Sequence, residues 1–364
     1  MKDIGEILTG STPSTSQEDY YCSDGILWVT PSDIDSNIIK NTARKLSIKG
    51  EKVARIVPKN TILVTCIASI GKNALVLEKS SFNQQINSLT PFDKYNPYFL
   101  LTDSVLWSSK MKQQGAAGMM QIVNKNEFSE IETNIPSEEE QNKIGELYKQ
   151  IDNLITLHQR KYDKLVNIKK SMLEKMFPKN DSKTPEIRFK GFTEDWEQRK
   201  FENIFDYERP DKYIVSSDEY SEISKIPVLT ANKAFILGYT DEINVYKKEK
   251  ESIIFDDFTL DSKFVDFPYM VKSSAIKILT LKDKNNNNLR FNYELLSNHK
   301  FNMLGHARHY ISVVQPEEIL TTNKSEQDKI ASIMTNIDNL ITLHQRKLDK
   351  LNNFKKSMLE KMFV

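Results

Sequence analysis

Two long segments of the chain carry apolar residues at the spacing of an amphipathic helix. A heptad counted from Ile144 places Ile144, Ile151, His158, Leu165 and Met172 at its a positions and Leu147, Leu154, Lys161, Ile168 and Lys175 at its d positions. The second segment has Ile330, Ile337, His344, Leu351 and Met358 at a and Ile333, Leu340, Lys347, Phe354 and Lys361 at d. The pattern is typical of a coiled-coil seam. A further apolar stripe at the e positions contains Tyr148, Ile155, Tyr162 and Met176. We therefore predict two long helices that pair along a seam broad enough to face more than one partner.

The two helical segments are copies of one another. IDNLITLHQRKYDKLVNIKKSMLEKMF (151–177) and IDNLITLHQRKLDKLNNFKKSMLEKMF (337–363) are offset by 186 residues and differ at three positions. A weaker match upstream pairs EQNKI (140–144) with EQDKI (326–330). Ser137 before Glu140 predicts a capping box at the start of the first helix, and Ser325 before Asp328 predicts a weaker one. The chain therefore alternates variable block, helix, variable block, helix.

About 40 helical residues give a rod of roughly 60 Å. The paired rods form either a plain structural hairpin or a spacer of fixed length. Near-identity at solvent-facing positions favours a partner surface that occurs twice, because a seam constrains only about three positions in seven; a recent duplication explains it equally well. If the rods pair antiparallel, His158 and His344 face each other across a pseudo-twofold axis. We expect a register-setting polar layer there rather than a metal site.

The two blocks between the helices read as mixed α and β domains. The predicted strands are 26–30, 61–69 and 73–78 in the first block and 226–230, 252–255 and 275–281 in the second. The run 285–288 predicts an exposed loop, and 96–99 predicts a turn. The expected divisions are 1–137 for the first domain, 138–178 for the first helix, 179–323 for the second domain with a linker at 179–185, and 324–364 for the second helix. We expect an α+β protein whose two domains are joined by an antiparallel coiled coil.

Polar loops in both blocks have the residue types that contact DNA. Hydroxyls and backbone amides suit phosphates, and side-chain amides bind adenine edges. For any single residue a solvated loop remains the plainer interpretation, but together the loops suggest DNA binding. The residues that we select are Thr12, Ser14, Ser32, Lys72, Asn83, Gln84, Gln85, Arg209, Lys212, Tyr213, Thr230, Asn232, Lys233, Lys263, Lys272, Arg308 and His309.

Composition excludes several classes of protein. The 364 residues carry a formal net charge of +1, so any basic surface must be local. There is no apolar run long enough for a membrane helix, and the N-terminal residues lack the layout of a signal peptide. Two cysteines, Cys22 and Cys66, do not make a disulfide framework and are expected to be packing residues in a cytoplasmic protein.

The sequence offers no catalytic residue that we would select. Gly71-Lys72 lacks the other residues of a phosphate-binding loop, and no zinc-protease, nucleophile-elbow or paired-cysteine motif occurs. Asn96-Pro97-Tyr98-Phe99 lacks the second proline of the adenine methyltransferase motif and has no glycine-rich cofactor loop before it. Pro210-Asp211 with Lys212 lacks the second acidic residue of a nuclease site. We therefore expect no metal and no cofactor bound by this chain.

Over essentially its whole length the chain resembles the specificity subunit of Type I restriction-modification systems. The residues that carry the resemblance are EEQNKIGELYKQIDNLITLHQRK (139–161) with its second copy, RFKGFTEDWEQRKF (188–201), GSTPSTS (10–16), WVTPSDI (28–34) and FNQQINSL (82–89). One departure is that the first block has no counterpart of TPEIRFKGFTEDWEQRK (184–200), so the packing of the N-terminal domain against the far end of the helix pair does not follow from the resemblance.

The resemblance implies a function shared with partners. Each domain would read one half of a bipartite target in double-stranded DNA, and the helices would set the spacing and dock two methyltransferase subunits. S-adenosylmethionine, ATP and Mg would be used by those subunits and by the restriction motor-nuclease subunits of the complex. This chain would be non-catalytic.

Two other functions remain open from the residues themselves. One is a scaffold without DNA binding, in which both domains bind proteins. The other is a self-contained methyltransferase or nuclease, which the missing motifs disfavour.

Overall fold

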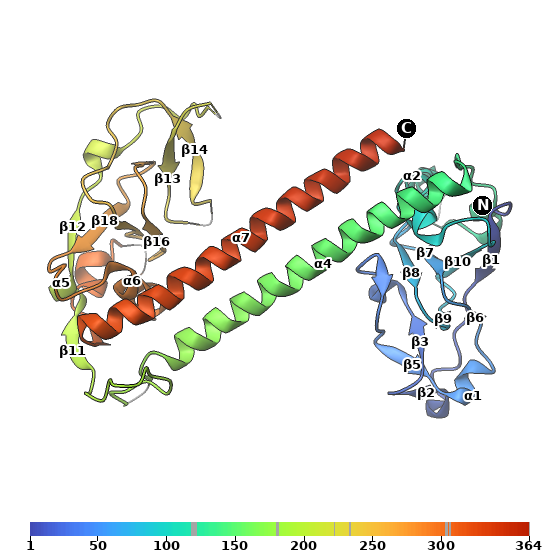
Figure 1. Cartoon of the computed structure of the whole chain (residues 1–364), viewed down its shortest axis with the longest axis horizontal. Helices are drawn as coiled ribbons and strands as arrows, with labels where there is room; N and C mark the ends of the chain where they lie inside the picture. Colours follow the sequence, from blue (N-terminus) through green and yellow to red (C-terminus); the bar gives the residue numbers. More distant parts are fainter. Residues whose placement is uncertain are drawn as a thin grey trace. The chain divides into compact units, whose positions relative to one another are not determined.

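The protein folds as two compact units in the computed structural model, which describes residues 1–117, 122–179, 182–221, 223–232, 234–302, 305 and 307–363. The first unit comprises Met1–Gln159 and Arg346–Val364, and the second comprises Arg160–Gln345. Two long helices, α4 (Glu138–Lys175) and α7 (Lys324–Met362), each contribute to both units (Figure 1). Each unit also has its own mixed α and β domain, so the predicted fold class is confirmed.

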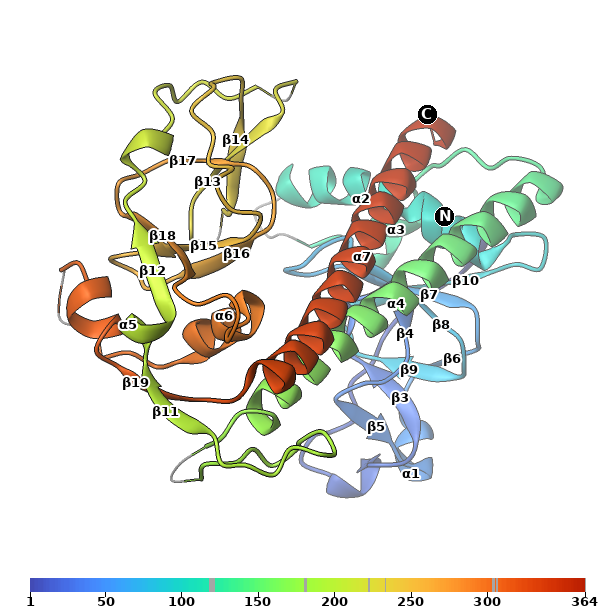
Figure 2. The ribbon, with the colours of Figure 1, turned by 60° about the vertical axis from the view of Figure 1, so that its left-hand side comes forward.

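The first unit contains two five-stranded sheets. One has the order β1-β10-β7-β8-β4 and the other β2-β5-β3-β9-β6; strands β3 to β10 are labelled in Figure 2. The strands are β1 (Gly5–Thr9), β2 (Tyr21–Cys22), β3 (Ile26–Val29), β4 (Ile38–Ile39), β5 (Arg44–Leu46), β6 (Ile56–Val57), β7 (Thr61–Thr65), β8 (Asn73–Val76), β9 (Ser80–Phe82) and β10 (Ile86–Pro91). The helices of this domain are α1 (Ile48–Glu51), α2 (Pro97–Ala117) and α3 (Lys125–Ser129).

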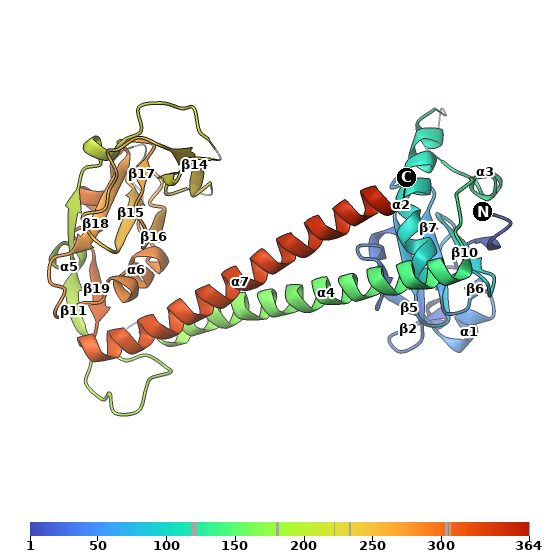
Figure 3. The same cartoon turned by 45° about the horizontal axis from the view of Figure 1, so that its top comes forward.

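The second unit contains three smaller sheets, with orders β12-β18-β15-β16, β14-β13-β17 and β11-β19 (Figure 3). The strands are β11 (Glu197–Lys200), β12 (Phe205–Glu208), β13 (Ile226–Leu229), β14 (Ile236–Thr240), β15 (Ser252–Asp256), β16 (Ser262–Val265), β17 (Met270–Val271), β18 (Ile276–Leu281) and β19 (Glu318–Thr321). The helices are α5 (Phe201–Ile204) and α6 (Leu289–Asn298), and a π-helical turn covers Tyr310–Val314. All six predicted strand segments contain a strand.

The two domains share a sheet topology despite the lack of comparable sequence repetition. In the first unit β1 pairs with β10, β10 with β7 and β7 with β8, all antiparallel. In the second unit β12, β18, β15 and β16 pair in the same succession, also antiparallel. The same strand order therefore presents two different sets of loops.

Within each unit α4 and α7 run antiparallel, and each domain is anchored to α4 or α7 by a buried glutamine. Gln141 accepts from the backbone N of Asn96 at 3.1 Å, and Gln327 accepts from the backbone N of Asn288 at 2.8 Å. Both glutamines lie in the weak upstream match, 186 residues apart. The side chain of Asn96 also accepts from the backbone N of Phe99, so 96–99 begins helix α2 and the predicted turn is wrong.

Aromatic contacts at the helix ends repeat in the same way. Phe363 stacks on Phe99 with ring centroids 5.7 Å apart in the first unit, and Phe177 stacks on Phe291 at 5.5 Å in the second. Such pairs contribute about 1 kcal/mol beyond their buried area. At Gly145 an added Cβ would lie 2.5 Å from the side-chain oxygen of Asn96, so glycine permits this close approach.

Of the three predicted apolar stripes, a and e are buried and d is exposed. Ile144, Tyr148 and Ile151 of α4 are buried, which are a and e positions, whereas Leu154 at a d position is 45% exposed. In α7 the buried residues Ile330, Met334, Ile337 and Leu348 also lie at a and e, with Ala331 at b buried beside them, and Leu340 at d is 44% exposed. Apolar residues occupy the a, d and e positions in this sequence. Their spacings of three and four residues are compatible with a buried face made of a and d or with one made of a and e. Burial of the bulky Tyr148 selects the a and e stripe and leaves d outside.

One cap prediction and one loop prediction also change. Asn323, not Ser325, caps α7, because its side chain accepts from the backbone N of Glu326 at 3.1 Å. The run 285–288 is only partly an exposed loop, because Asn287 is buried and Asn288 caps α6 by accepting from the backbone N of Phe291. The first cap lies where we expected it, since the hydroxyl of Ser137 accepts from the backbone N of Glu140 at 3.4 Å.

Candidate nucleic-acid interface

Four loops converge at one edge of the first unit. They are residues 10–14 after β1, 30–33 after β3, 66–72 between β7 and β8, and 83–85 between β9 and β10; we call them edge 1. Backbone hydrogen bonds tie the loops together, and each is 2.9 Å long: Ser11 N to Phe82 O, Asn83 N to Val29 O, and Cys66 N to Gln85 O. The sheet order thus gathers segments that are far apart in the sequence.

Edge 1 contains all seven first-domain residues that the sequence selected. Thr12, Ser14, Ser32, Lys72 and Gln84 are exposed, and Gln85 is half-buried. The hydroxyl of Thr12 donates to the side-chain oxygen of Gln84, so the first and last loops are joined by side chains as well. The amide nitrogen of Gln84 and the Lys72 ammonium remain as donors for an acidic ligand.

Asn83 is a correction. Its side chain is 9% exposed, accepts from the backbone N of Gln85 at 3.0 Å and contacts the side chain of Gln85. It holds the loop in shape and does not present its amide to solvent. Loop-shaping asparagines have the same sequence signature as base-reading ones, because the same amide serves both purposes.

A corresponding set of loops lies in the second unit. Residues 209–213 follow β12, 230–232 follow β13, 257–261 join β15 to β16, and 272–275 precede β18; we call them edge 2. Lys272 N donates to Leu229 O at 3.0 Å, and Asp257 N donates to Ala275 O at 2.9 Å. Edge 2 occupies the same end of its antiparallel sheet as edge 1 does in the first unit.

Several selected residues of the second domain are exposed at or beside edge 2. Arg209, Lys212 and Asn232 are exposed on its loops, and the exposed Arg308 lies over the ring of Phe258, 5.8 Å from its centroid. Lys263 is half-buried on β16. Lys233 lies outside the described residues. Tyr213 is half-buried and its hydroxyl donates to Glu208 at 3.2 Å.

Three selected residues of the second domain are already engaged or buried. His309 is 1% exposed and Thr230 is 8% exposed, so neither side chain is available to DNA in this structure. Lys272 is paired with Asp218. His309 was selected from the sequence together with Arg308, which is exposed. A short polar segment does not indicate which of two adjacent side chains turns inward.

A buried ion pair that the sequence did not indicate supports edge 2. Lys277 and Asp257 lie 3.1 Å apart with side chains 3% and 2% exposed. Asp257 also accepts from the backbone N of Tyr310 at 2.8 Å. The only sequence signal is a lysine within the apolar strand 275–281. Because a buried carboxylate needs such partners, the pair fixes where the loop after β15 begins.

Cys66 occupies in edge 1 the place that Asp257 occupies in edge 2, because it directly follows β7 as Asp257 directly follows β15. Burial raises the pKa of its thiol to about 11, so it stays protonated and behaves as a packing residue, as predicted. Cys22 and Cys66 are both free cysteines. No group of three or more His, Cys, Asp or Glu side chains in the described residues is placed to hold a metal ion.

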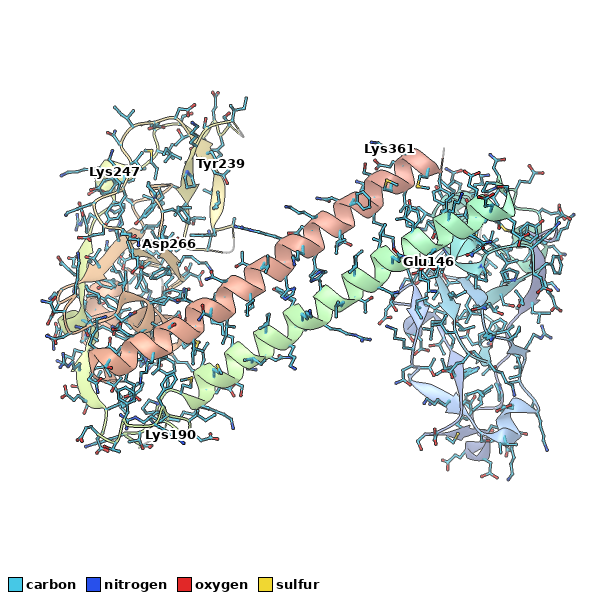
Figure 4. The ribbon with its side chains drawn as sticks, in the orientation of Figure 1. Glu146, Lys190, Tyr239, Lys247, Asp266 and Lys361 are labelled. Atoms are coloured by element: carbon cyan, nitrogen blue, oxygen red, sulfur yellow. The ribbon has the colours of Figure 1, made fainter. Side chains whose placement is uncertain are left out.

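Apolar side chains remain exposed on the long helices. Leu154 and Leu157 of α4 are each 45% exposed in the first unit, and Leu340 and Leu343 of α7 are 44% and 45% exposed in the second. These are the same two positions of the repeat. Figure 4 shows the side chains of both helices, with Glu146 on α4 and Lys361 on α7 labelled. No helix within the described ranges is long and apolar enough to cross a membrane.

Other helix predictions are only partly addressed. Within its own unit Leu147 is half-buried, as are Leu165 and Leu351, whereas Ile330 and Ile337 are buried. The meeting of His158 and His344 concerns residues of different units and stays a prediction. The boundaries proposed for the domains likewise stay predictions, although α4 and α7 begin at Glu138 and Lys324.

Two known proteins with similar sequences are both specificity subunits of Type I restriction enzymes. The specificity subunit of the Type I restriction enzyme EcoR124I/EcoR124II from Escherichia coli is 40% identical over 138 residues, which are 37% of this chain and 34% of that protein. The MjaIX specificity subunit of Methanocaldococcus jannaschii is 31% identical over 186 residues, 49% of this chain and 42% of that protein. The aligned part thus spans less than half the length of either relative.

The fold has a counterpart among solved structures. The crystal structure of a Type I restriction-modification S subunit from M. genitalium superposes with a TM-score of 0.73 at 14% identity, over 100% of this chain and 94% of that chain.

A model of the family described as Type I restriction modification DNA specificity domain matches residues 1–167 and 193–353, which is most of the sequence. The chain therefore belongs to the family of Type I restriction modification DNA specificity domains.

Proposed function

We propose that this chain is the DNA specificity subunit of a Type I restriction-modification complex, in which edge 1 reads one half of a bipartite target and edge 2 reads the other. The observation that carries the proposal is the pair of loop sets built on one strand order. An asymmetric target needs two different readers, and shared sheets with unlike loops supply them. Exposed amides, hydroxyls and cations on both edges suit phosphates and base edges.

The long helices are proposed to set the distance between the two halves of the target. A helix of 38 residues, the length of α4, is roughly 57 Å long, which corresponds to about 17 base pairs. The exposed leucine pairs at equivalent repeat positions support docking of the same kind of partner twice. We assign that surface to two methyltransferase subunits, and restriction subunits join through the complex.

The chemistry is proposed to belong to those partners. S-adenosylmethionine would be used by the methyltransferase subunits, and ATP with Mg by the motor-nuclease subunits. This chain would orient the DNA and remain non-catalytic. Its contribution is binding energy that differs between sequences, supplied by base contacts, on a background of phosphate contacts that do not discriminate.

DNA binding by the purified complex tests the proposal against a protein-only scaffold. We expect affinity for a cognate duplex that falls steeply and linearly on a log–log plot against salt, with preference over unrelated duplexes of about a thousandfold or more. A scaffold predicts no such binding by this chain and no change when it is replaced by the chain of another system. Equal affinity for all duplexes would contradict the proposal.

A further inference from the structure

One arginine of the first unit lies over an aromatic ring beside edge 1, and a second aromatic ring packs edge-to-face against the first. The guanidinium carbon of Arg44 on β5 lies 5.4 Å from the centroid of the Tyr21 ring, and Tyr21 meets Trp28 edge-to-face at 5.6 Å. Arg44 and Trp28 are also partners in the register of β5 and β3. The arginine is exposed, and it forms no ion pair within the part of the chain that the structure describes.

The same two rings are bonded to the first loop of edge 1. The hydroxyl of Tyr21 donates to the backbone oxygen of Pro13 at 2.7 Å, and the indole N–H of Trp28 donates to that of Ser11 at 3.3 Å. Arg44 is therefore fixed relative to the loop that carries Thr12 and Ser14. A guanidinium stacked on an aromatic ring loses less conformational freedom when it binds, and its donor fork is already oriented.

Arg44 lines a hollow of about 390 Å³ together with Thr15, Glu18, Tyr21, Cys22 and Ala43. Glu18 is exposed there, in the short 3-10 turn that precedes β2. A carboxylate beside the arginine disfavours a phosphate as the ligand, because it would repel that charge. A G·C base pair instead offers two acceptors on guanine and an amino donor on cytosine in the major groove. One cation and one carboxylate match that pattern.

We propose that Arg44 and Glu18 form a subsite that reads a G·C base pair in the half-target of the first unit. Arg44 donates to O6 and N7 of the guanine, and Glu18 accepts from N4 of the cytosine or of the neighbouring pair. Tyr21 and Trp28 are positioning residues. This inference rests on the proposed function and adds a base preference to it. Neither the helical repeat nor the polar loops indicated it.

The test uses the complex of the full chain with its methyltransferase partner and a set of duplexes in which each base pair of the cognate target is changed in turn. The variants are Arg44→Lys, which keeps the charge and removes the fork, and Glu18→Gln. Lys40→Gln, an exposed cation of the same unit outside the hollow, is the control. Urea unfolding of each variant shows whether it folds like the parent chain.

We expect Arg44→Lys to lose discrimination at one G·C pair by about tenfold to a hundredfold, with the salt slope unchanged. Glu18→Gln should weaken discrimination at that pair or the adjacent one, and Lys40→Gln at none. Uniform weakening on all duplexes together with a shallower salt slope would assign Arg44 to a phosphate and overturn the inference. Unchanged discrimination by a folded Arg44→Lys would also overturn it. A parent complex without any sequence preference would instead reject the proposed function itself.

Discussion

Lys355 donates a hydrogen bond to Asp152 at 2.5 Å, although 203 residues separate them along the chain. The equivalent pair in the second unit, 186 positions away in each partner, is Lys169 with Asp338 at 2.8 Å. One lysine–aspartate contact is thus made twice, once in each unit, with the roles of α4 and α7 exchanged. This is the relationship expected when a duplicated helix pairs antiparallel with its own copy.

The aspartate of the first pair has a further partner, which predicts a stability effect. Asp152 also accepts from the hydroxyl of Tyr98 at 2.7 Å, and burial raises the pKa of that tyrosine so that it stays a donor. Asp152→Ala leaves Lys355 and Tyr98 without this acceptor. We expect a loss of roughly 1–3 kcal/mol in the free energy of unfolding, measured in urea.

The matched control is Glu139→Ala on the same helix. Glu139 pairs with Lys143 four residues on, and both side chains are highly exposed. Such surface pairs contribute about 0.3–0.5 kcal/mol. If the two variants lost equal stability, the half-buried contact of Asp152 would not stabilise the docking of the first domain.

A pH dependence follows from Asp103 on α2, which is 1% exposed. Burial raises the pKa of its carboxyl to about 6, against the hydrogen bond that it accepts from Thr133 at 2.7 Å. The folded state therefore holds a proton that the unfolded chain releases near pH 4. Stability from this residue is full below pH 4, falls as the pH rises from about 4 through 6, and stays constant at higher pH, where both states have lost the proton.

Asp103→Asn removes the titrating proton while keeping an acceptor for Thr133. We expect this variant to unfold at higher urea than the parent at pH 7.5, by roughly 1–3 kcal/mol, and to match it at pH 4. The difference between the two chains across pH isolates this carboxyl from the other acids. A difference that does not change between pH 4 and 7.5 would refute the assignment.

The two amides of the 83–85 loop should behave differently. Gln84 is exposed and Asn83 is buried, so Gln84→Ala should leave stability unchanged and relax the DNA preference at one position by about 1–3 kcal/mol. Asn83→Ala should lower the free energy of unfolding by about 1 kcal/mol because Gln85 N loses its acceptor. Urea titration and binding to single-base duplex variants measure both effects. Loss of base preference without loss of stability in Asn83→Ala would return that residue to the reading surface.

The exposed leucines should matter for assembly and not for folding. Replacing Leu154 and Leu157 by serine in the first unit, or Leu340 and Leu343 in the second, should weaken methyltransferase binding tenfold or more, because about 1 kcal/mol of apolar burial is lost per leucine. Sedimentation of mixtures of the subunits measures this effect. Asn153→Ser, an exposed neighbour, is the control. Full assembly of both double variants would place the partner surface elsewhere.

Sequence patterns sufficed for features that depend on local periodicity. Strands such as β7 and β18 are short β-branched runs, and α4 and α7 carry long amphipathic repeats without proline or glycine breaks after Gly145. The common strand order of the two domains was not foreseen, because pairing of β1 with β10 joins residues about 80 positions apart. The loops and strands of the two blocks differ in sequence, so comparing the blocks did not reveal their common strand order.

Side-chain direction was the other limit. The helix pattern contained three apolar stripes, and the choice between d and e depended on how Tyr148 packs against the domain. Asn83 and His309 have polar side chains that turn inward, while Gln84 and Arg308 beside them face solvent. Arg44 was overlooked because its significance comes from Tyr21 and Trp28, which only the fold brings beside it.

Methylome sequencing of cells that carry this chain with its methyltransferase partner, against cells that lack the chain, tests the central claim most directly. Two domains that read two half-targets at a spacing set by α4 and α7 predict chain-dependent adenine methylation in both halves of a split motif with one fixed gap. Methylation at a single uninterrupted motif, or methylation that does not depend on this chain, would contradict it.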